Sequence, residues 1–351
     1  MEQDAPLVAI CMATHEPDAT LLRRQIDSIK HQTHSHFVCL IGDDHSSESG
    51  WSTILDCVDG DPRFTCLAAE ERGGFYRNFE RVLSRVPADA TYVALSDQDD
   101  YWYPEKVARL LAALADSDAD LAYCDMRIVS NDGDVVSPSF FADRPNNRTD
   151  LTSMLIANSV TGAASMFRRE LLIDALPFPN PIGAAFHDQW LACVALARGD
   201  LAYVDRPLQD YVRHGANVTD SGIARGDLRS GVLAALQRLV SDPRRRIGST
   251  IRNAGAIYEG DLKRVELFAR TIEVRLDGRI DRRRARDLRR LSRLRSSPRT
   301  FAWLVVRSLV DVHGRSPSRG AEIQLAKGVI WGWCRAGRGG NVRRWWRPRT
   351  R

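Results

Sequence analysis

An apolar run that ends in a cluster of carboxylates constrains this chain more than any other feature of its 351 residues. Residues 92–95 are apolar, and Ser96-Asp97-Gln98-Asp99-Asp100 follows them directly. Pro104 then precedes a stretch whose apolar residues have helical spacing, and proline is favoured at the first position of a helix. The segment therefore predicts a buried strand, an acidic loop and a helix that begins at Pro104.

Two of these carboxylates are suited to a metal ion. Asp97 and Asp99 are two residues apart, so in extended backbone they project to one side. Carboxylates at the carboxyl end of a strand form a hard oxygen site for Mg²⁺ or Mn²⁺, where phosphates commonly complete the shell. We expect Asp99 to be the main metal ligand, and Asp97 to lie nearer a ribose or a metal-bound water. Asp100 fits an outward-facing cap for the following helix equally well.

The chain alternates between strand-like and helix-like segments over its first half. Apolar runs at 7–12, 37–41, 64–67 and 92–95 alternate with helical patterns at 20–31, 51–58 and 75–86. Such alternation predicts a doubly wound α/β sheet of mainly parallel strands. Later segments predict strands at 121–124, 126–129, 161–167 and 201–204, helices at 170–175 and 188–197, and a loop region over the site at 137–158.

Charge divides the chain into two regions. Residues 1–220 hold 18 basic and 34 acidic side chains, whereas residues 221–351 hold 32 basic and 11 acidic ones. We therefore predict two domains with a boundary near residue 220, the second helical and strongly basic. Basic residues beside tryptophans there favour an anionic membrane surface or lipid-linked partner over nucleic acid, with a solvated helical bundle as the plain alternative.

Composition excludes several classes of protein. The seven cysteines show no C-x-x-C spacing and have an odd total, which argues against a disulfide framework or a zinc site. No run of about 18 apolar residues predicts a membrane span, and no signal-peptide pattern precedes the first strand. We expect a cytoplasmic protein, peripheral at the inner face of the plasma membrane.

Other candidate residues follow predicted strands or open predicted helices. A carboxylate at Asp44 can accept the N3–H of uracil or thymine beside Thr14, or it can form an Asx turn. Asp188 opens a helix, where it is either a general base or a helix-stabilising anion. His214 lies in a polar loop, where a histidine is a ligand or is solvated. Arg72, before two glycines, belongs to a plain turn or approaches a diphosphate.

Taken together, these residues resemble the inverting glycosyltransferases of family 2, which have the GT-A fold, and most of all their bacterial rhamnosyltransferase-like branch. The likeness covers roughly residues 7–220, where the motifs occur in family order. The matching segments are Ala13-Thr14-His15-Glu16-Pro17-Asp18, Arg24-Gln25-Ile26-Asp27-Ser28-Ile29, Asp43-Asp44-His45-Ser46, Gly74-Phe75-Tyr76-Arg77-Asn78-Phe79-Glu80, Ser96-Asp97-Gln98-Asp99-Asp100, Thr161-Gly162-Ala163-Ala164, His187-Asp188-Gln189-Trp190-Leu191 and His214-Gly215.

The resemblance implies a role for each matching residue. Thr14 and Asp44 look like nucleoside-binding positions, and Asp97 and Asp99 look like the D-x-D pair that holds a divalent cation and the donor diphosphate. Asp188 looks like the catalytic base. His214 looks like the late histidine that approaches the metal or the diphosphate.

Two departures from the family pattern lie near the donor. His15-Glu16 stands where many members have Tyr-Asn, and Arg72 stands where Asn often precedes the glycine. We include Glu16 and Arg72 among the donor-binding residues. Because both departures lie at the donor end, the identity of the donor is the inference that they affect most.

The expected fold is therefore GT-A, a Rossmann-like and mostly parallel sheet with flanking helices, plus a basic helical C-terminal region. The expected activity is metal-dependent, inverting transfer of rhamnose or another hexose from dTDP-rhamnose or a UDP-hexose. The expected acceptor is a glycan or a polyprenyl-diphosphate-linked glycan in cell-surface polysaccharide synthesis. Two alternatives stay open: a sugar nucleotidyltransferase, although its Gly-rich phosphate loop is missing after the first strand, and a non-catalytic membrane or nucleic-acid adaptor.

Overall fold

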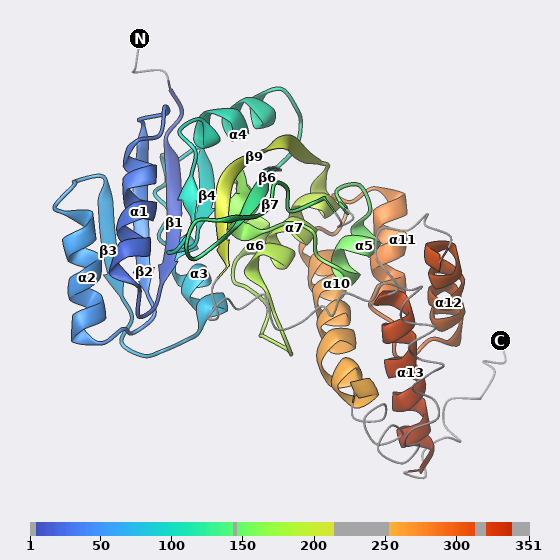
Figure 1. Ribbon diagram of the computed structural model, residues 1–351. Helices are drawn as coiled ribbons and strands as arrows, with labels where there is room; N and C mark the ends of the chain where they lie inside the picture. Colours follow the sequence, from blue (N-terminus) through green and yellow to red (C-terminus); the bar gives the residue numbers. More distant parts are fainter. Residues whose placement is uncertain (1–4, 143–145, 214–252, 313–320, 339–351) are drawn as a thin grey trace.

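The computed structural model describes residues 5–142, 146–213, 253–312 and 321–338. A curled sheet with helices on both faces forms the larger part of the molecule, and a group of helices from the end of the chain packs at one side (Figure 1). The strands are β1 (Val8–Thr14), β2 (Phe37–Asp43), β3 (Phe64–Ala68), β4 (Tyr92–Ser96), β5 (Tyr101–Trp102), β6 (Leu121–Ser130), β7 (Val135–Ser137), β8 (Ser165–Arg168) and β9 (Leu201–Arg213). The first seven helices are α1 (Ala19–Lys30), α2 (Glu48–Val58), α3 (Phe75–Leu83), α4 (Lys106–Ala115), α5 (Leu151–Ile156), α6 (Leu171–Ala175) and α7 (His187–Arg198).

The described strands form one sheet in the order β3-β2-β1-β4-β8-β6-β9-β5, with β7 paired to β6. β1 to β4 are parallel to one another where they pair, and β6 is parallel to β9. β8 lies antiparallel between β4 and β6. Thr14 pairs with Asp43, and Met12 pairs with Ser96, so β1, β2 and β4 end at the same edge of the sheet. The prediction of a GT-A-like, mainly parallel sheet is confirmed.

Each face of the sheet carries its own hydrophobic core. In β1, Ile10 and Met12 point to one face and Cys11 to the other, as the alternation of a strand requires. Helices α1, α2 and α4 cover the first face. Helices α3, α5 and α7 cover the second face, where the core continues into the C-terminal helices.

Several predicted elements differ from the observed ones. Helix α4 begins at Lys106 instead of Pro104, because the Pro104 carbonyl accepts a hydrogen bond from the Thr33 backbone N–H at 2.9 Å. Residues 121–130 form one strand with a bulge at Asp125 instead of two strands. The predicted loop region 137–158 contains α5, whose first turn is capped by Asp150 through the Ser153 N–H at 2.7 Å.

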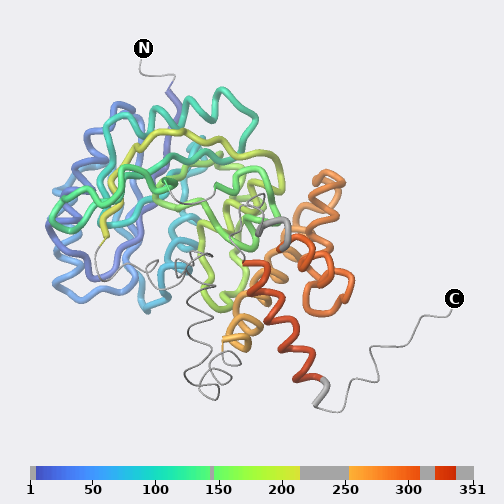
Figure 2. Tube along the Cα trace, turned by 45° about the vertical axis from the view of Figure 1, so that its right-hand side comes forward, coloured from blue at the N-terminus to red at the C-terminus, as the bar shows by residue number. Residues whose placement is uncertain are grey.

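The C-terminal helices pack on the second face of the sheet domain beside α7 (Figures 1 and 2). Trp190 of α7 meets Phe268 edge to face, with ring centroids 5.0 Å apart. Gly183, in the loop before α7, has a φ of +60°, and a Cβ there would lie 2.8 Å from the Cα of Gly260. The described elements are a π-helical turn (Tyr258–Leu262), α10 (Lys263–Arg275), α11 (Arg282–Leu291), α12 (Pro298–Val312) and α13 (Ala321–Arg338).

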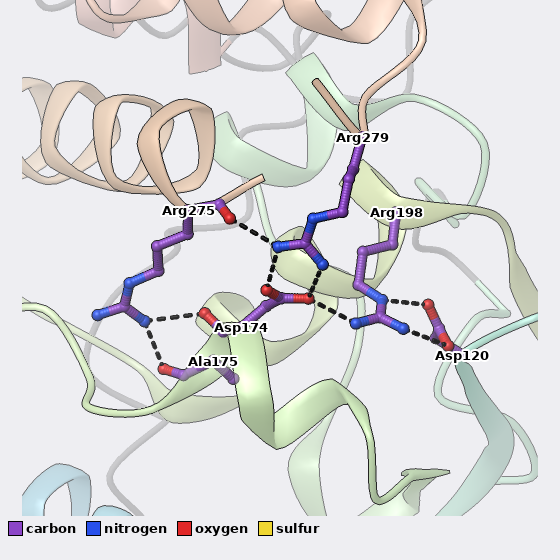
Figure 3. A network of polar contacts seen from close by, with 6 residues as sticks. All are labelled: Asp120, Asp174, Ala175, Arg198, Arg275 and Arg279. Atoms are coloured by element: carbon purple, nitrogen blue, oxygen red, sulfur yellow. Dashed lines mark hydrogen bonds and ion pairs between the residues drawn. The ribbon is translucent and has the colours of Figure 1, made fainter. Parts of the chain in front are cut away.

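Arginines tie these helices to the sheet domain (Figure 3). Arg279 donates to both carboxylate oxygens of Asp174, at 2.6 and 3.1 Å, and Arg275 donates to the carbonyls of Asp174 and Ala175 at 2.9 Å. Arg198 bridges Asp174 at 2.5 Å and Asp120 at 2.7 Å. Some of the arginines of the C-terminal region therefore bind groups of the sheet domain instead of an external partner. Within the described residues, no helix is long and apolar enough to cross a membrane.

Candidate active site

The loop after β4 is held in place by side chains around it. Gln98 accepts a hydrogen bond from the His15 backbone N–H at 2.9 Å and donates to the His15 carbonyl at 3.3 Å. Arg24 of α1 donates to the backbone carbonyl of Asp99 at 3.2 Å. These contacts join the ends of β1 and β4, so that the Asp97–Asp99 pair is presented at the carboxyl edge of the sheet.

Asp97 lies among other charged groups. Burial, together with the nearby negative charges of Asp99 and Asp188, raises the pKa of Asp97 to about 7. Asp188 is 91 residues away along the chain, so the fold brings the two predicted acidic sites together. Proximity of like charges favours a proton or a cation between them.

Asp188 stands in the first turn of α7, and three hydrogen bonds fix its carboxylate. Asn158 donates from Nδ2 at 3.0 Å, the Gln189 backbone N–H at 2.5 Å and the Gly162 backbone N–H at 3.3 Å. Burial nonetheless raises the pKa of Asp188 to about 6, against the effect of the two backbone donors. The group is therefore a carboxylate near neutral pH that accepts a proton readily.

The close approach of Gly162 to His187 allows the Gly162 backbone N–H to reach the Asp188 carboxylate. The His187 ring stacks on Phe79 with centroids 3.8 Å apart, which anchors the start of α7. A Cβ at Gly162 would lie 2.6 Å from Nε2 of His187. Only glycine lets the short 3-10 helix Gly162–Ala164 approach α7 closely enough for its N–H to reach Asp188.

Lys106 is a residue that motif reasoning missed. It is 0% exposed, and its Nζ donates to the Ala163 carbonyl and to Oε1 of Gln209. Gln209 in turn donates to Asp100 at 3.0 Å. Asp100 is therefore a buried partner of β9 and not an outward-facing helix cap. The spacing of Lys106 with Leu110 and Leu114, four residues apart, places it on the buried face of α4 and could have shown this.

Replacing Lys106 with Met should lower the free energy of unfolding by about 1–3 kcal/mol. The change leaves the Ala163 carbonyl and the Gln209 oxygen buried without a donor, and such a loss has about this cost. Urea unfolding followed by circular dichroism measures the effect, with Lys327→Met on the exposed side of α13 as the matched control. Equal unfolding midpoints for the two variants would contradict this structural role.

The predicted nucleoside residues are close together but almost fully buried. Thr14 is 2% exposed and donates to Asp43 at 3.2 Å, and Asp43 also accepts from Ser46. Asp44 is 4% exposed and accepts hydrogen bonds from the backbone N–H groups of Gly73 and Gly74 at 2.7 and 2.8 Å. Each carboxylate oxygen has a further lone pair, so Asp44 fixes this loop and still has acceptor capacity.

Glu16 and Arg72 lie on the exposed rim of the same edge. Glu16 accepts from the Ser47 backbone N–H at 2.6 Å and from the Ser47 hydroxyl at 2.9 Å, at the start of α2. These hydrogen bonds lower the pKa of Glu16, and the nearby charge of Arg72 contributes to the effect. Glu16 and Arg72 are thus close to one another beside the Thr14 loop, and their role at the donor stays a prediction.

The donor set for a cation consists of carboxylate oxygens. Among the described residues, no group of three or more His, Cys, Asp or Glu side chains is arranged to hold a metal ion. His214, the third predicted member, lies outside the described residues. The Asp97–Asp99 pair nevertheless offers hard carboxylate oxygens, which are the ligands that Mg²⁺ or Mn²⁺ prefers.

Comparison with known proteins identifies the family of a domain in the first half of the chain. Residues 9–176 match the model of glycosyl transferase family 2. The chain carries a family 2 glycosyl transferase domain. Among curated relatives of this glycosyltransferase, the dTDP-rhamnosyl transferase RfbG of Shigella flexneri is 25% identical over 236 residues, which cover 61% of this chain and 75% of RfbG. An uncharacterised glycosyltransferase of Methanocaldococcus jannaschii is 23% identical over 197 residues, covering 55% and 67%.

The fold of this glycosyltransferase is also similar to that of a solved structure. Residues 1–349 of S. aureus TarS, in complex with UDP-GlcNAc, superpose with a TM-score of 0.52 over 95% of this chain and 92% of that one. The identity is 14%, so the likeness concerns the fold. It extends over the C-terminal helices as well as the sheet, since nearly the whole chain is covered.

Proposed function

We propose that this glycosyltransferase moves rhamnose or another hexose from a nucleoside-diphosphate sugar to an acceptor hydroxyl, with inversion at the anomeric carbon. The observation that carries the proposal is the position of Asp188 beside the Asp97–Asp99 pair at the carboxyl edge of the sheet. A base and a diphosphate site on one edge are what a single displacement needs. The rhamnosyl transferase RfbG supports dTDP-rhamnose as donor, and TarS with UDP-GlcNAc supports a UDP-sugar.

In this mechanism Asp188 removes the proton of the acceptor hydroxyl. The hydroxyl oxygen attacks the anomeric carbon as the bond from that carbon to the diphosphate oxygen breaks on the opposite face. The hydrogen bonds from Asn158 and Gly162 keep the carboxylate aimed while it gains the proton. One displacement inverts the centre without a covalent glycosyl-enzyme, so general-base assistance is the protein's main contribution at the acceptor.

We propose that Asp99, with Asp97 and His214, holds a divalent cation. The cation would neutralise charge on the departing nucleoside diphosphate. Asp97 would lie nearest the ribose, and the Gln98 and Arg24 contacts would keep the pair oriented. Thr14, Asp44, Glu16 and Arg72 would form the donor-nucleotide end, with Arg72 as the exposed cation beside the phosphates.

The proposed acceptor is a glycan or a polyprenyl-diphosphate-linked glycan used in cell-surface polysaccharide synthesis. Residues 1–220 would hold the donor and the base, while residues 221–351 would contact the acceptor at the inner face of the plasma membrane. The exposed aliphatic residues Val306 and Ile330 and the basic face of α11 support contact with such a surface.

A screen of sugar nucleotides tests the function. The full chain is incubated with dTDP-rhamnose, UDP-hexoses and GDP-mannose, with and without Mn²⁺, and release of the nucleoside diphosphate is measured. We expect turnover of one donor and dependence on the cation. Release of pyrophosphate from a sugar phosphate and a nucleoside triphosphate would instead support the nucleotidyltransferase alternative, which has no phosphate loop after β1 to favour it.

The pH dependence of transfer should follow Asp188. Because burial raises its pKa to about 6, the carboxyl group holds its proton below that pH and cannot act as a base. We therefore expect kcat/KM to be level near pH 7–8 and to fall about tenfold for each unit below about pH 6. A rate profile from pH 5 to 8, with donor binding measured at each pH as control, checks this. A level profile down to pH 5 would contradict it.

A further inference from the structure

A groove between α11 and the beginning of α12 is lined mainly by arginines. Its volume is about 620 Å³, and Ser297 and Thr300 also line it. The groove lies on the C-terminal helices and shares none of its lining residues with the Asp97–Asp188 site. The lining arginines are Arg282, Arg286, Arg289, Arg290 and Arg293.

The spacing of these arginines places them in one stripe. Arg282, Arg286 and Arg289 are separated by four and three residues, so they follow one another along one face of α11, and Arg293 lies in the turn two residues beyond the end of the helix. Leu288 and Leu291 are fully buried on the other face. Like charges at this spacing destabilise a helix by about 0.2–0.5 kcal/mol for each pair. The stripe therefore weakens α11 by itself, and a bound anion would remove that repulsion.

Most of the groove charge has no internal counter-charge. Arg290 pairs with Asp287 at 3.3 Å, and Arg289 donates to the Ala285 carbonyl at 3.1 Å. In the part of the chain that the structure describes, Arg282, Arg286 and Arg293 have no acidic partner. Other arginines of the C-terminal region have acidic partners: Arg264 pairs with Asp261, Arg279 with Asp174, Arg284 with Asp200, Arg295 with Glu266, and Arg307 with Asp150 and Glu322.

The start of α12 adds further positive character to the groove. Ser297 accepts the Thr300 backbone N–H at 3.2 Å, so it lies at the start of α12, which has 15 residues. The N-terminus of a helix of this length carries a partial positive charge and favours phosphate. Guanidinium groups bind phosphate oxygens through two parallel hydrogen bonds. The groove thus combines two independent features that both suit a phosphate group.

Apolar side chains lie beside the groove. The Arg290 guanidinium lies 5.3 Å from the ring centroid of Trp303, which is one turn beyond Thr300. Val306, a further turn along α12, is 60% exposed. Trp303 itself is half-buried, and basic residues beside such aromatic and exposed aliphatic side chains are typical of a surface that meets lipid headgroups. A nucleic acid would need stacking aromatics between the charges, whereas here the aromatic and aliphatic residues lie to one side.

We propose that this arginine groove is a second anion site, which binds the phosphate of a lipid headgroup at a membrane surface. The partner rests on the proposed function, since a lipid-linked acceptor and the surrounding phospholipids share this phosphate chemistry. The binding itself does not depend on sugar transfer. The groove would hold the enzyme at the surface where its acceptor is presented, while the donor site on the sheet edge stays open to solution.

The test compares two variants of the full chain with equal loss of charge. The groove variant carries Arg282→Gln, Arg286→Gln, Arg289→Gln and Arg293→Gln, and it keeps Arg284 because that residue pairs with Asp200. The control variant carries Arg85→Gln, Arg109→Gln, Arg206→Gln and Arg270→Gln, which are exposed outside the groove. Cosedimentation with phosphatidylcholine vesicles, with and without phosphatidylglycerol, measures binding. Thermal unfolding by circular dichroism confirms that both variants fold.

We expect the wild type to bind the phosphatidylglycerol vesicles, the groove variant to bind about tenfold or more weakly, and the control to remain within about threefold. Titration with inorganic pyrophosphate forms the second arm. If the wild type binds pyrophosphate but no vesicles, and the groove variant loses pyrophosphate binding, the groove is a site for a soluble phosphate compound and the assignment to lipid is wrong. An equal loss of vesicle binding in the groove variant and the control variant overturns the proposal, and so does a wild type that binds neither vesicles nor pyrophosphate. If the wild type binds a single-stranded oligonucleotide more tightly than it binds phosphatidylglycerol vesicles, the assignment to lipid is wrong.

Donor hydrolysis separates this proposal from the proposed function. The groove variant should release nucleoside diphosphate at the wild-type rate in solution, because none of its four arginines belongs to the candidate active site. If the wild type hydrolyses no donor but binds vesicles through the groove, the proposed function fails and the anion site stands. If the wild type hydrolyses a donor but its vesicle binding does not depend on the groove, the proposed function stands and the anion site fails.

Discussion

Replacing Asp188 with Asn is expected to reduce sugar transfer by about 10²–10⁴-fold, the usual contribution of a general base. Asn has the size of Asp and its oxygen can still accept from Asn158 or Gly162, so the start of α7 should keep its geometry. It cannot take the proton of the acceptor hydroxyl. Initial rates of transfer, together with donor affinity by calorimetry, measure the effect, and donor affinity should stay close to that of the wild type.

The same substitution at Asp200 is the matched control. Asp200 follows α7 at its other end, and its exposed carboxylate pairs with Arg284 at 2.7 Å. Asp200→Asn should change transfer by less than about twofold, since an exposed ion pair contributes little. If Asp188→Asn and Asp200→Asn transfer sugar equally well, Asp188 serves only as an anion in the first turn of a helix.

Replacing Asp99 with Ala is expected to lower donor turnover by about 10²-fold or more while the protein stays folded. The reason is electrostatic: the proposed site balances negative charge as the diphosphate leaves, and losing one such stabilising group has about this effect. Excess EDTA should abolish wild-type activity, and Mn²⁺ should restore it. Nucleoside diphosphate release at saturating donor is the measurement.

Asp132→Ala provides the comparison for this second result. Asp132 is exposed in the turn between β6 and β7, outside the candidate site, and its loss should leave turnover unchanged. Full activity of the wild type in excess EDTA would rule out the metal requirement. Retained turnover in Asp99→Ala would move the proposed site away from this carboxylate.

The strands and their ends could be predicted because they depend on local patterns. The apolar runs before Thr14, Asp43 and Asp97 are each short and end in polar residues, and parallel strands bring such ends to one edge. The α/β order and the register at this edge follow from that. Likewise, the apolar spacing of Leu110 and Leu114 predicted α4, although contacts with Thr33 and β9 delay its start by two residues.

The parts that could not be predicted depend on partners far apart in the chain. Nothing near Asp188 in the sequence indicates that Asn158 and Gly162 will donate to it, and its place at a helix start left a general base and a helix-stabilising anion both open until the family resemblance favoured the base. The basic C-terminal region looked uniform as a sequence. In the structure, Arg279 meets Asp174 while Arg286 and Arg293 meet no acid among the described residues, a difference that tertiary packing decides.

The packing of the C-terminal helices on α7 has a consequence for how the protein is made. The strands that carry Thr14, Asp43 and Asp97 leave the ribosome first, but Trp190 stays uncovered until Phe268 and the helices after it have been synthesised. At about 5–20 residues per second, the chain from residue 198 to Leu294 takes roughly 5–20 s. During that interval the sheet edge at Thr14, Asp43 and Asp97 can already form, whereas the loop at Gly183 still lacks Gly260 as its neighbour. The nascent chain should therefore form the proposed donor edge before the helix that carries Asp188 is fully packed.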